Sequence, residues 1–133
     1  MPQIDVFFYG TFMDRAELAR QSCEPAQMRS AWLDGFAIRI GRRATLVPSR
    51  RGRVYGMLAT LPAEDVQRLY SELVDYRPET VIVRTDETTQ LAACCFNLPR
   101  APDEDEHDEE YAAKLRALAE RLDFPADYIA TIR

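Results

Sequence analysis

The first residues with a capacity for chemistry lie near the N-terminus, at positions 9–13 (Tyr-Gly-Thr-Phe-Met). The apolar run before them, residues 6–8, predicts a buried strand, and Asp14 followed by Glu17 predicts the start of a helix directly after them. Gly10 allows the backbone to turn between the two. Loops of this kind present N–H groups that bind anions, carboxylates or developing oxyanions. The sequence therefore predicts an anion-binding loop, with an ordinary strand end as the alternative.

The carboxylate of Glu72 is a second candidate group. A helix is expected from Pro62 to about Leu73, and its apolar residues recur at helical spacing in one core-facing stripe: Val66, Leu69, Tyr70 and Leu73. Glu72 lies about 60° outside this stripe, at about 100° per residue. Apolar surroundings raise the pKa of a carboxyl group, which suits a general acid or base. A solvated surface position is the alternative, because carboxylates are rarely buried.

The cysteines and the single histidine favour structural roles. Cys94 and Cys95 are adjacent in an apolar strand, where packing is favoured over redox chemistry. Together with Cys23 they make an odd count, which is typical of a reducing compartment and predicts a cytoplasmic protein. His107 has neither triad partners nor a ligand set near it in the sequence, which favours a surface role.

Arginines and tyrosines near the predicted turns leave two interpretations open. The arginines could bind an acidic ligand, or they could be solvated or paired with carboxylates: Arg39, Arg42, Arg43, Arg50, Arg51 and Arg53. The phenols of Tyr55 and Tyr76 could lend hydroxyls to a site, or they could pack.

The composition predicts one globular domain over residues 1–133. The chain is 47% hydrophobic and 29% charged, with a net charge of −5 that disfavours non-specific nucleic-acid binding. Seven carboxylates stand within residues 103–110, and removing these seven charges changes −5 to +2. This run predicts a solvated linker that favours the start of the next helix. The sequence contains no signal segment and no apolar stretch of membrane-spanning length, so no membrane partner is expected.

The elements that must position these groups predict an α+β fold. Strands are expected at residues 6–8, 32–40, 44–47, 53–61, 80–85 and 91–98, with a turn at 49–52. Helices are expected at residues 14–21, 62–73 and 111–122, followed by a short turn or strand at 127–132. Gly56 inside a strand indicates a bulge, a bend or the close approach of another group. We expect a small mixed, mostly antiparallel β-barrel of about six strands with flanking helices.

The residues that carry a resemblance are the loop Tyr9-Gly10-Thr11 after the first strand, the later strand of residues 54–58 (Val-Tyr-Gly-Met-Leu), and the helix with Glu72. In this combination, from about residue 6 to residue 83, the chain resembles the γ-glutamylcyclotransferase-like family, which includes γ-glutamylamine cyclotransferases and AIG2-like proteins. The resemblance implies a compact barrel surrounded by helices, with no metal and no cofactor.

The resemblance also implies roles for individual residues. The loop would hold the amino-acid end of a small γ-glutamyl substrate through its backbone, with the predicted contacts Tyr9, Gly10, Thr11, Phe12 and Tyr76. A glutamate would be the acid–base catalyst, here Glu72. Two departures stand out: Phe12 replaces a leucine or asparagine, and Glu72 is one residue closer than usual to Leu69-Tyr70, which replaces the family's Leu-Asp. Glu79 is therefore a second candidate.

The implied reaction needs few protein groups. The substrate's α-amino group attacks its own γ-carbonyl, so that 5-oxoproline forms and an amine or peptide is released. The protein must orient the substrate, transfer protons and stabilise the oxyanion. The alternative is a non-catalytic binding protein for an amino-acid-like ligand or a protein partner, and another is an enzyme for a different acyl amide. Glutamates that point to solvent, away from the loop of residues 9–11, would favour the binding protein.

Overall fold

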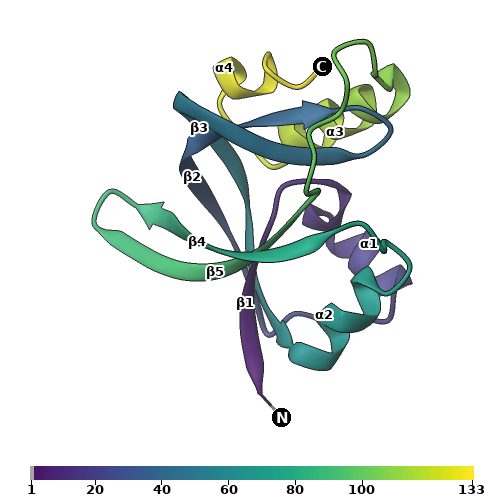
Figure 1. The fold of residues 1–133 in the computed structure, drawn as a ribbon. Helices are drawn as coiled ribbons and strands as arrows, with labels where there is room; N and C mark the ends of the chain where they lie inside the picture. Colours follow the sequence, from purple (N-terminus) through teal and green to yellow (C-terminus); the bar gives the residue numbers. More distant parts are fainter. Residues whose placement is uncertain (1) are drawn as a thin grey trace.

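The computed structural model describes residues 2–133 as a closed β-barrel with the strand order β1-β3-β2-β4-β5 (Figure 1). Its strands are β1 (Gln3–Phe8), β2 (Gln27–Ile40), β3 (Ala44–Pro62), β4 (Arg77–Asp86) and β5 (Thr89–Asn97). Neighbouring strands are antiparallel except β1 and β5, which are parallel. The predicted fold class, a mixed and mostly antiparallel barrel with flanking helices, is confirmed.

The barrel has five strands where about six were expected, because residues 44–47 and 53–61 belong to one long strand, β3. Asp34 pairs with Arg53 while Phe36 pairs with Pro48, so residues 49–52 lie opposite Gly35 as a large bulge. Gly35 adopts a φ of +89°, in the left-handed region that favours glycine. The predicted turn is thus a bulge that bends β3 without taking it out of the sheet.

The helices begin close to the positions that the sequence predicts. The end of α2 and the structure of the C-terminal segment differ from the prediction. Asp14 caps α1 (Arg15–Arg20) by accepting a hydrogen bond from the Ala16 N–H, and Asp108 caps α3 (Glu109–Arg121). α2 (Ala63–Tyr70) ends three residues early, where the Ser71 hydroxyl donates to the Arg68 carbonyl. The C-terminal segment contains the short helix α4 (Ala126–Ile129) in place of the expected turn or strand.

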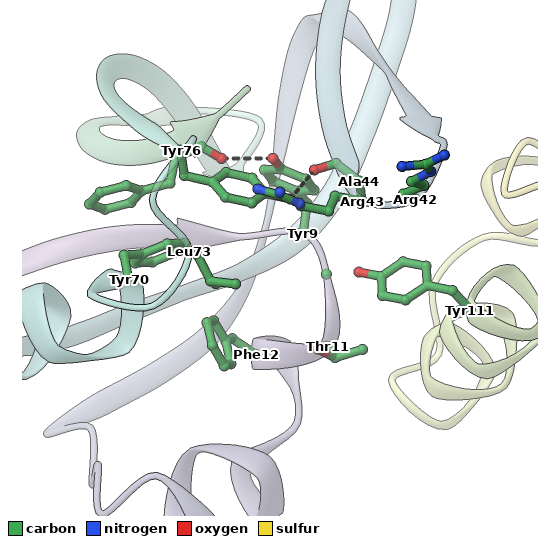
Figure 2. Close-up of a pocket in the computed structure, with 12 residues that line it drawn as sticks. Tyr9, Thr11, Phe12, Arg42, Arg43, Ala44, Tyr70, Leu73, Tyr76 and Tyr111 are labelled. Carbon is green, nitrogen blue, oxygen red and sulfur yellow. Dashed lines mark hydrogen bonds between the residues drawn. The ribbon is translucent and has the colours of Figure 1, made fainter. Parts of the chain in front are cut away.

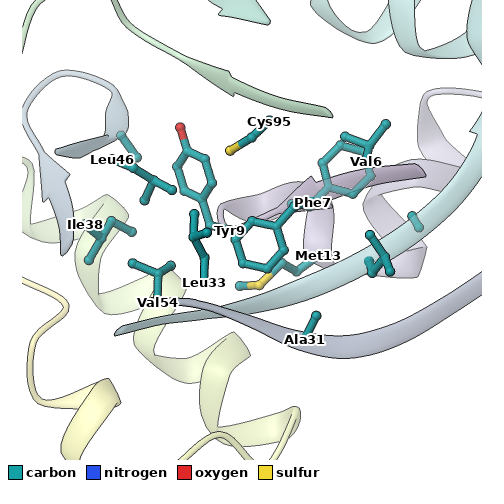
Figure 3. Packing of buried hydrophobic residues seen from close by; sticks show 14 of the residues in the cluster. Val6, Phe7, Tyr9, Met13, Ala31, Leu33, Ile38, Leu46, Val54 and Cys95 are labelled. Carbon is teal, nitrogen blue, oxygen red and sulfur yellow. The ribbon is translucent and has the colours of Figure 1, made fainter. Parts of the chain in front are cut away.

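The barrel interior holds the main hydrophobic core. Figure 3 shows Phe7, Tyr9, Val54 and Cys95 among the side chains packed inside it. Burial raises the pKa of the Cys95 thiol to about 12, which fits its predicted packing role. Outside the barrel, α1 and α2 lie together near β1, while α3 and α4 lie near the far end of the β2–β3 hairpin (Figure 1). Within residues 2–133, no helix is both long enough and apolar enough to cross a bilayer.

Gly56 lies where β3 crosses the end of β1. A Cβ atom at this position would stand 2.3 Å from the Phe8 carbonyl oxygen and 2.8 Å from the Phe7 ring. Of the three predicted explanations for this glycine, close approach of another group is therefore confirmed. The neighbouring atom is backbone of a buried strand, which cannot move aside easily.

We expect Gly56→Ala to lower the free energy of unfolding by about 1–3 kcal/mol, because the added methyl group overpacks the β1–β3 contact. Urea denaturation measures this change. Ser30→Ala is the control, since Ser30 is exposed on the neighbouring strand and its replacement should change the free energy by less than about 0.5 kcal/mol. Equal stability of the two variants would contradict the packing assignment.

Candidate functional site

The loop after β1 contains backbone amides that have no acceptor within the turn, as its sequence predicted. Residues Thr11–Met13 form a 3₁₀ turn in which the Met13 N–H donates to the Gly10 carbonyl at 3.0 Å. The first N–H groups of such a turn have no partner within it. Within residues 2–133, none of the N–H groups of Gly10, Thr11 and Phe12 donates to a backbone group outside the regular elements.

A cavity of about 190 Å³ lies beside this loop (Figure 2). Its lining comes from five separate parts of the chain: Tyr9, Gly10, Thr11, Phe12, Arg42, Arg43, Ala44, Tyr70, Leu73, Tyr76, Phe96 and Tyr111. All five predicted substrate contacts are in this lining. Their role in binding a substrate stays a prediction.

Aromatic rings form most of the cavity wall. Tyr70 stacks on Phe96 with ring centroids 3.9 Å apart, and Phe12 and Tyr76 pack against other sides of Tyr70. Tyr111 points toward the Gly10 loop from the opposite side (Figure 2). From the sequence, Tyr70 and Tyr111 belonged only to the apolar stripes of two helices. Their helical spacing indicated that they face the interior of the protein, but it could not distinguish packing in the core from lining a cavity.

Two of the four phenol groups around the cavity, those of Tyr9 and Tyr76, make hydrogen bonds within the protein. The Tyr9 ring points into the barrel (Figure 3), and its hydroxyl lies 2.7 Å from the Phe96 carbonyl oxygen and 2.9 Å from the Asn97 Oδ1. The Tyr76 hydroxyl donates to the Ala44 carbonyl. Burial raises the pKa of Tyr76 to about 12 and that of Tyr9 further. Both phenols are therefore neutral at physiological pH, and Tyr9 offers mainly its backbone to a ligand.

Asn97 connects this part of the site to Glu79. Its side chain is only 4% exposed, and its Oδ1 accepts hydrogen bonds from the Tyr9 hydroxyl and, at 3.3 Å, from the Leu46 N–H. Its Nδ2 donates to the Glu79 Oε2 at 3.1 Å. The carboxylate of Glu79 is therefore one side chain away from Tyr9.

Neither candidate glutamate lines the cavity. Glu72 is exposed in the turn that follows α2, because the helix ends at Tyr70, and Glu79 is on β4. Within the described residues 2–133, the charged side chains in the lining are those of Arg42 and Arg43. The cavity therefore suits a ligand with anionic groups, and its walls present no carboxylate that could take up a proton.

The predicted arginine patch is divided among several places. Arg42 and Arg43 reach the cavity, and Arg43 pairs with Asp75 at 3.0 Å. Arg53 pairs with Asp34 and lies over the Trp32 ring, 5.1 Å from its centroid. For Arg43 and Arg53 the alternative of pairing with a carboxylate is therefore confirmed, and a role of Arg42 in binding an acidic ligand stays a prediction.

The fold and the cavity together define a class: small closed β-barrels with helices around them and a ligand-sized cavity beside the loop after the first strand. The family model described as gamma-glutamyl cyclotransferase, AIG2-like, matches residues 6–114. The chain belongs to this family, as the resemblance in its sequence predicted.

Several solved structures share the fold. A protein described as gamma-glutamyl cyclotransferase has a TM-score of 0.78 at 14% identity, over 98% of this chain and 86% of that chain. An uncharacterized protein from Homo sapiens has a TM-score of 0.79 at 16% identity, over 99% and 87%. A protein from Arabidopsis thaliana has a TM-score of 0.70 at 22% identity, over 94% and 96%. No curated protein sequence matches the chain.

Burial of Tyr9 predicts a loss of stability in alkaline solution. The folded state raises the pKa of this phenol above the unfolded value of about 10, so the folded state retains a proton that the unfolded state releases. The free energy of unfolding should therefore fall as the pH rises above about 10. Tyr9→Phe should remove about 1.4 kcal/mol of the loss between about pH 8 and about pH 11, as measured by urea denaturation.

Phe7→Leu is the matched control for this measurement. Phe7 is a buried aromatic residue of the same strand without a titrating group, so its replacement should lower the free energy of unfolding equally at both pH values. Identical alkaline losses in wild type and Tyr9→Phe would show that this phenol does not contribute.

Proposed function

We propose that this chain binds a small γ-glutamyl compound, with the amino-acid end of the compound against the loop of Gly10, Thr11 and Phe12. The observation that carries the proposal is the cavity itself, in which the backbone of the Gly10 loop and two arginines meet a wall of aromatic rings. The amides and arginines can bind the carboxylates of such a compound, and the aromatic rings can pack against the aliphatic chain that joins its polar ends. Membership of the gamma-glutamyl cyclotransferase, AIG2-like family supports the choice of ligand.

Binding without turnover is the function that this geometry supports best. Ring closure requires a group that removes a proton from the substrate's ammonium, within hydrogen-bond reach of it. The lining residues among 2–133 include no carboxylate, and their buried phenols hold their protons at neutral pH. Glu72 and Glu79 are both exposed and both absent from the lining, which supports the binding protein that the sequence left as the alternative.

Cyclisation to 5-oxoproline is the second candidate function, and the link from Glu79 through Asn97 to Tyr9 favours it. In this candidate a shift of the Glu79 side chain would bring its carboxylate to the bound α-amino group. It would then act as base toward that group and as acid toward the leaving nitrogen. Glu72 stays the acid–base residue predicted from the sequence, and both glutamates enter the test below.

Calorimetric titration with γ-glutamylglycine tests the binding function. We expect wild type to bind, and Thr11→Pro to bind about tenfold or more weakly, because proline removes the Thr11 N–H from the loop. Proline is tolerated at the first position of a helical turn, so the loop should keep its shape. Thr11→Ala is the control, which retains the amide and should bind as wild type does. No binding by wild type would contradict the proposed function.

Formation of 5-oxoproline from glutathione, γ-glutamyl dipeptides and γ-glutamyl-lysine separates the two candidates. For the binding function we expect wild type to form none while it still binds γ-glutamyl ligands. Turnover would instead establish cyclisation, and Glu79→Gln and Glu72→Gln would then identify the catalyst. The correct variant should lose about 10²–10⁴-fold in kcat, and the other should stay near wild type.

A further inference from the structure

We propose that Arg42 makes this site selective for γ-glutamyl compounds whose amide-linked group carries a carboxylate, such as γ-glutamyl amino acids and peptides. The inference rests on the proposed function and concerns the end of the ligand that lies away from the Gly10 loop.

A second cavity supplies the space for that end of the ligand. Its volume is about 530 Å³, and it is lined by Arg42, Arg43 and Asp75 together with residues 98–103 and Glu106. Arg42 and Arg43 also line the smaller cavity, so they stand at the border between the two. A ligand with its amino-acid end in the smaller cavity would pass these arginines on its way into the larger one.

The two arginines differ in how their charges are balanced. Arg43 forms an ion pair with Asp75 at 3.0 Å. Arg42 forms no ion pair with any acidic side chain of residues 2–133, although its backbone N–H lies 3.4 Å from the Glu106 Oε2. Arg42 is therefore the border residue whose guanidinium can meet a ligand carboxylate without first breaking an ion pair.

The backbone that carries Arg42 is held in place. The turn of residues 41–43 is closed by a hydrogen bond from the Gly41 N–H to the Arg43 carbonyl at 3.0 Å. The Arg39 guanidinium donates to the carbonyls of Pro102 and Asp103 in the segment that lines the larger cavity. A Cβ atom on Gly41 would stand 2.5 Å from the Pro102 Cβ, so the turn packs closely against this segment.

A carboxylate matches this arrangement better than a neutral or cationic group. A guanidinium is permanently charged and donates two parallel hydrogen bonds to a carboxylate. The larger cavity is also lined by three acidic residues, which would attract a cationic group, and by one further arginine: Asp75, Asp103, Glu106 and Arg100. If Arg42 determines selectivity, the site prefers a ligand whose far end is anionic. If the acidic residues determine it, the site prefers a cationic far end.

Three ligands of nearly equal size test the inference by calorimetric titration: γ-glutamylglycine, γ-glutamylethylamide and γ-glutamyl-2-aminoethylamide, whose far ends are anionic, neutral and cationic. We expect wild type to bind the glycine compound about tenfold more tightly than the ethylamide, and the cationic compound least tightly. Arg42→Gln should reduce the preference for glycine over ethylamide to about one. Arg51→Gln is the control, because this exposed arginine of β3 lines neither cavity, and it should keep the preference.

Other results would overturn the inference in different ways. Equal wild-type affinities for the glycine compound and the ethylamide, or tightest binding of the cationic compound, would overturn it and leave the proposed function intact. Equal losses for all three ligands in Arg42→Gln would place Arg42 at the amino-acid end instead. No binding of any of the three by wild type would overturn the proposed function, and this inference with it.

Discussion

The site depends on the way in which the barrel closes. β1 and β5 meet as parallel strands at a single residue pair, Val6 with Cys94, so the seam itself is short. The Tyr9 hydroxyl reinforces it just beyond this pair, through its contacts with the Phe96 carbonyl and the Asn97 side chain. Hydrogen bonds between buried groups are costly to leave unmade. The hydrogen bonds of its hydroxyl hold Tyr9 in place, and they therefore also fix the position of the loop that begins at Gly10.

The electrostatic character of the cavity follows from which side chains the barrel leaves at its mouth. Aromatic residues from α2, β5 and α3 close the walls, and the turn between β2 and β3 adds two arginines. Carboxylates are abundant in the chain, but within residues 2–133 none of them belongs to the lining of this cavity. This separation of charge explains how an acidic protein can offer a cavity suited to anions.

The acidic run has a positional role. Asp108 caps α3 by accepting a hydrogen bond from the Tyr111 N–H, and the Glu106 carboxylate lies against the Arg42 N–H. The prediction that this run favours the next helix start is confirmed by the cap. Through these contacts the run helps to place both Tyr111 and the turn of residues 41–43. It thereby links the two sides of the candidate site.

Short-range patterns in the sequence determined the elements and the family. The residues around Gly10 predicted a strand, a loop and a helix start, because glycine, a capping aspartate and a buried apolar run each act within a few positions. Gly56 predicted the close approach of another group to its strand, because a glycine within a strand leaves room that a side chain would fill. The bend of β3 opposite Gly35 is a bulge where the sequence predicts a turn, because bulges and turns share the same residue types.

Only the tertiary structure decided which side chains meet. The predicted position of Glu72 beside an apolar stripe requires a helix that continues to Leu73, but α2 ends at Tyr70 and leaves this glutamate exposed. Tyr111 reaches the Gly10 loop from about one hundred residues away, and Asn97 joins Tyr9 to Glu79, which no local spacing encodes. The sequence by itself therefore determined the strand, the loop and the helix start. The closure of the barrel decided that aromatic rings and arginines, and not a glutamate, surround the loop.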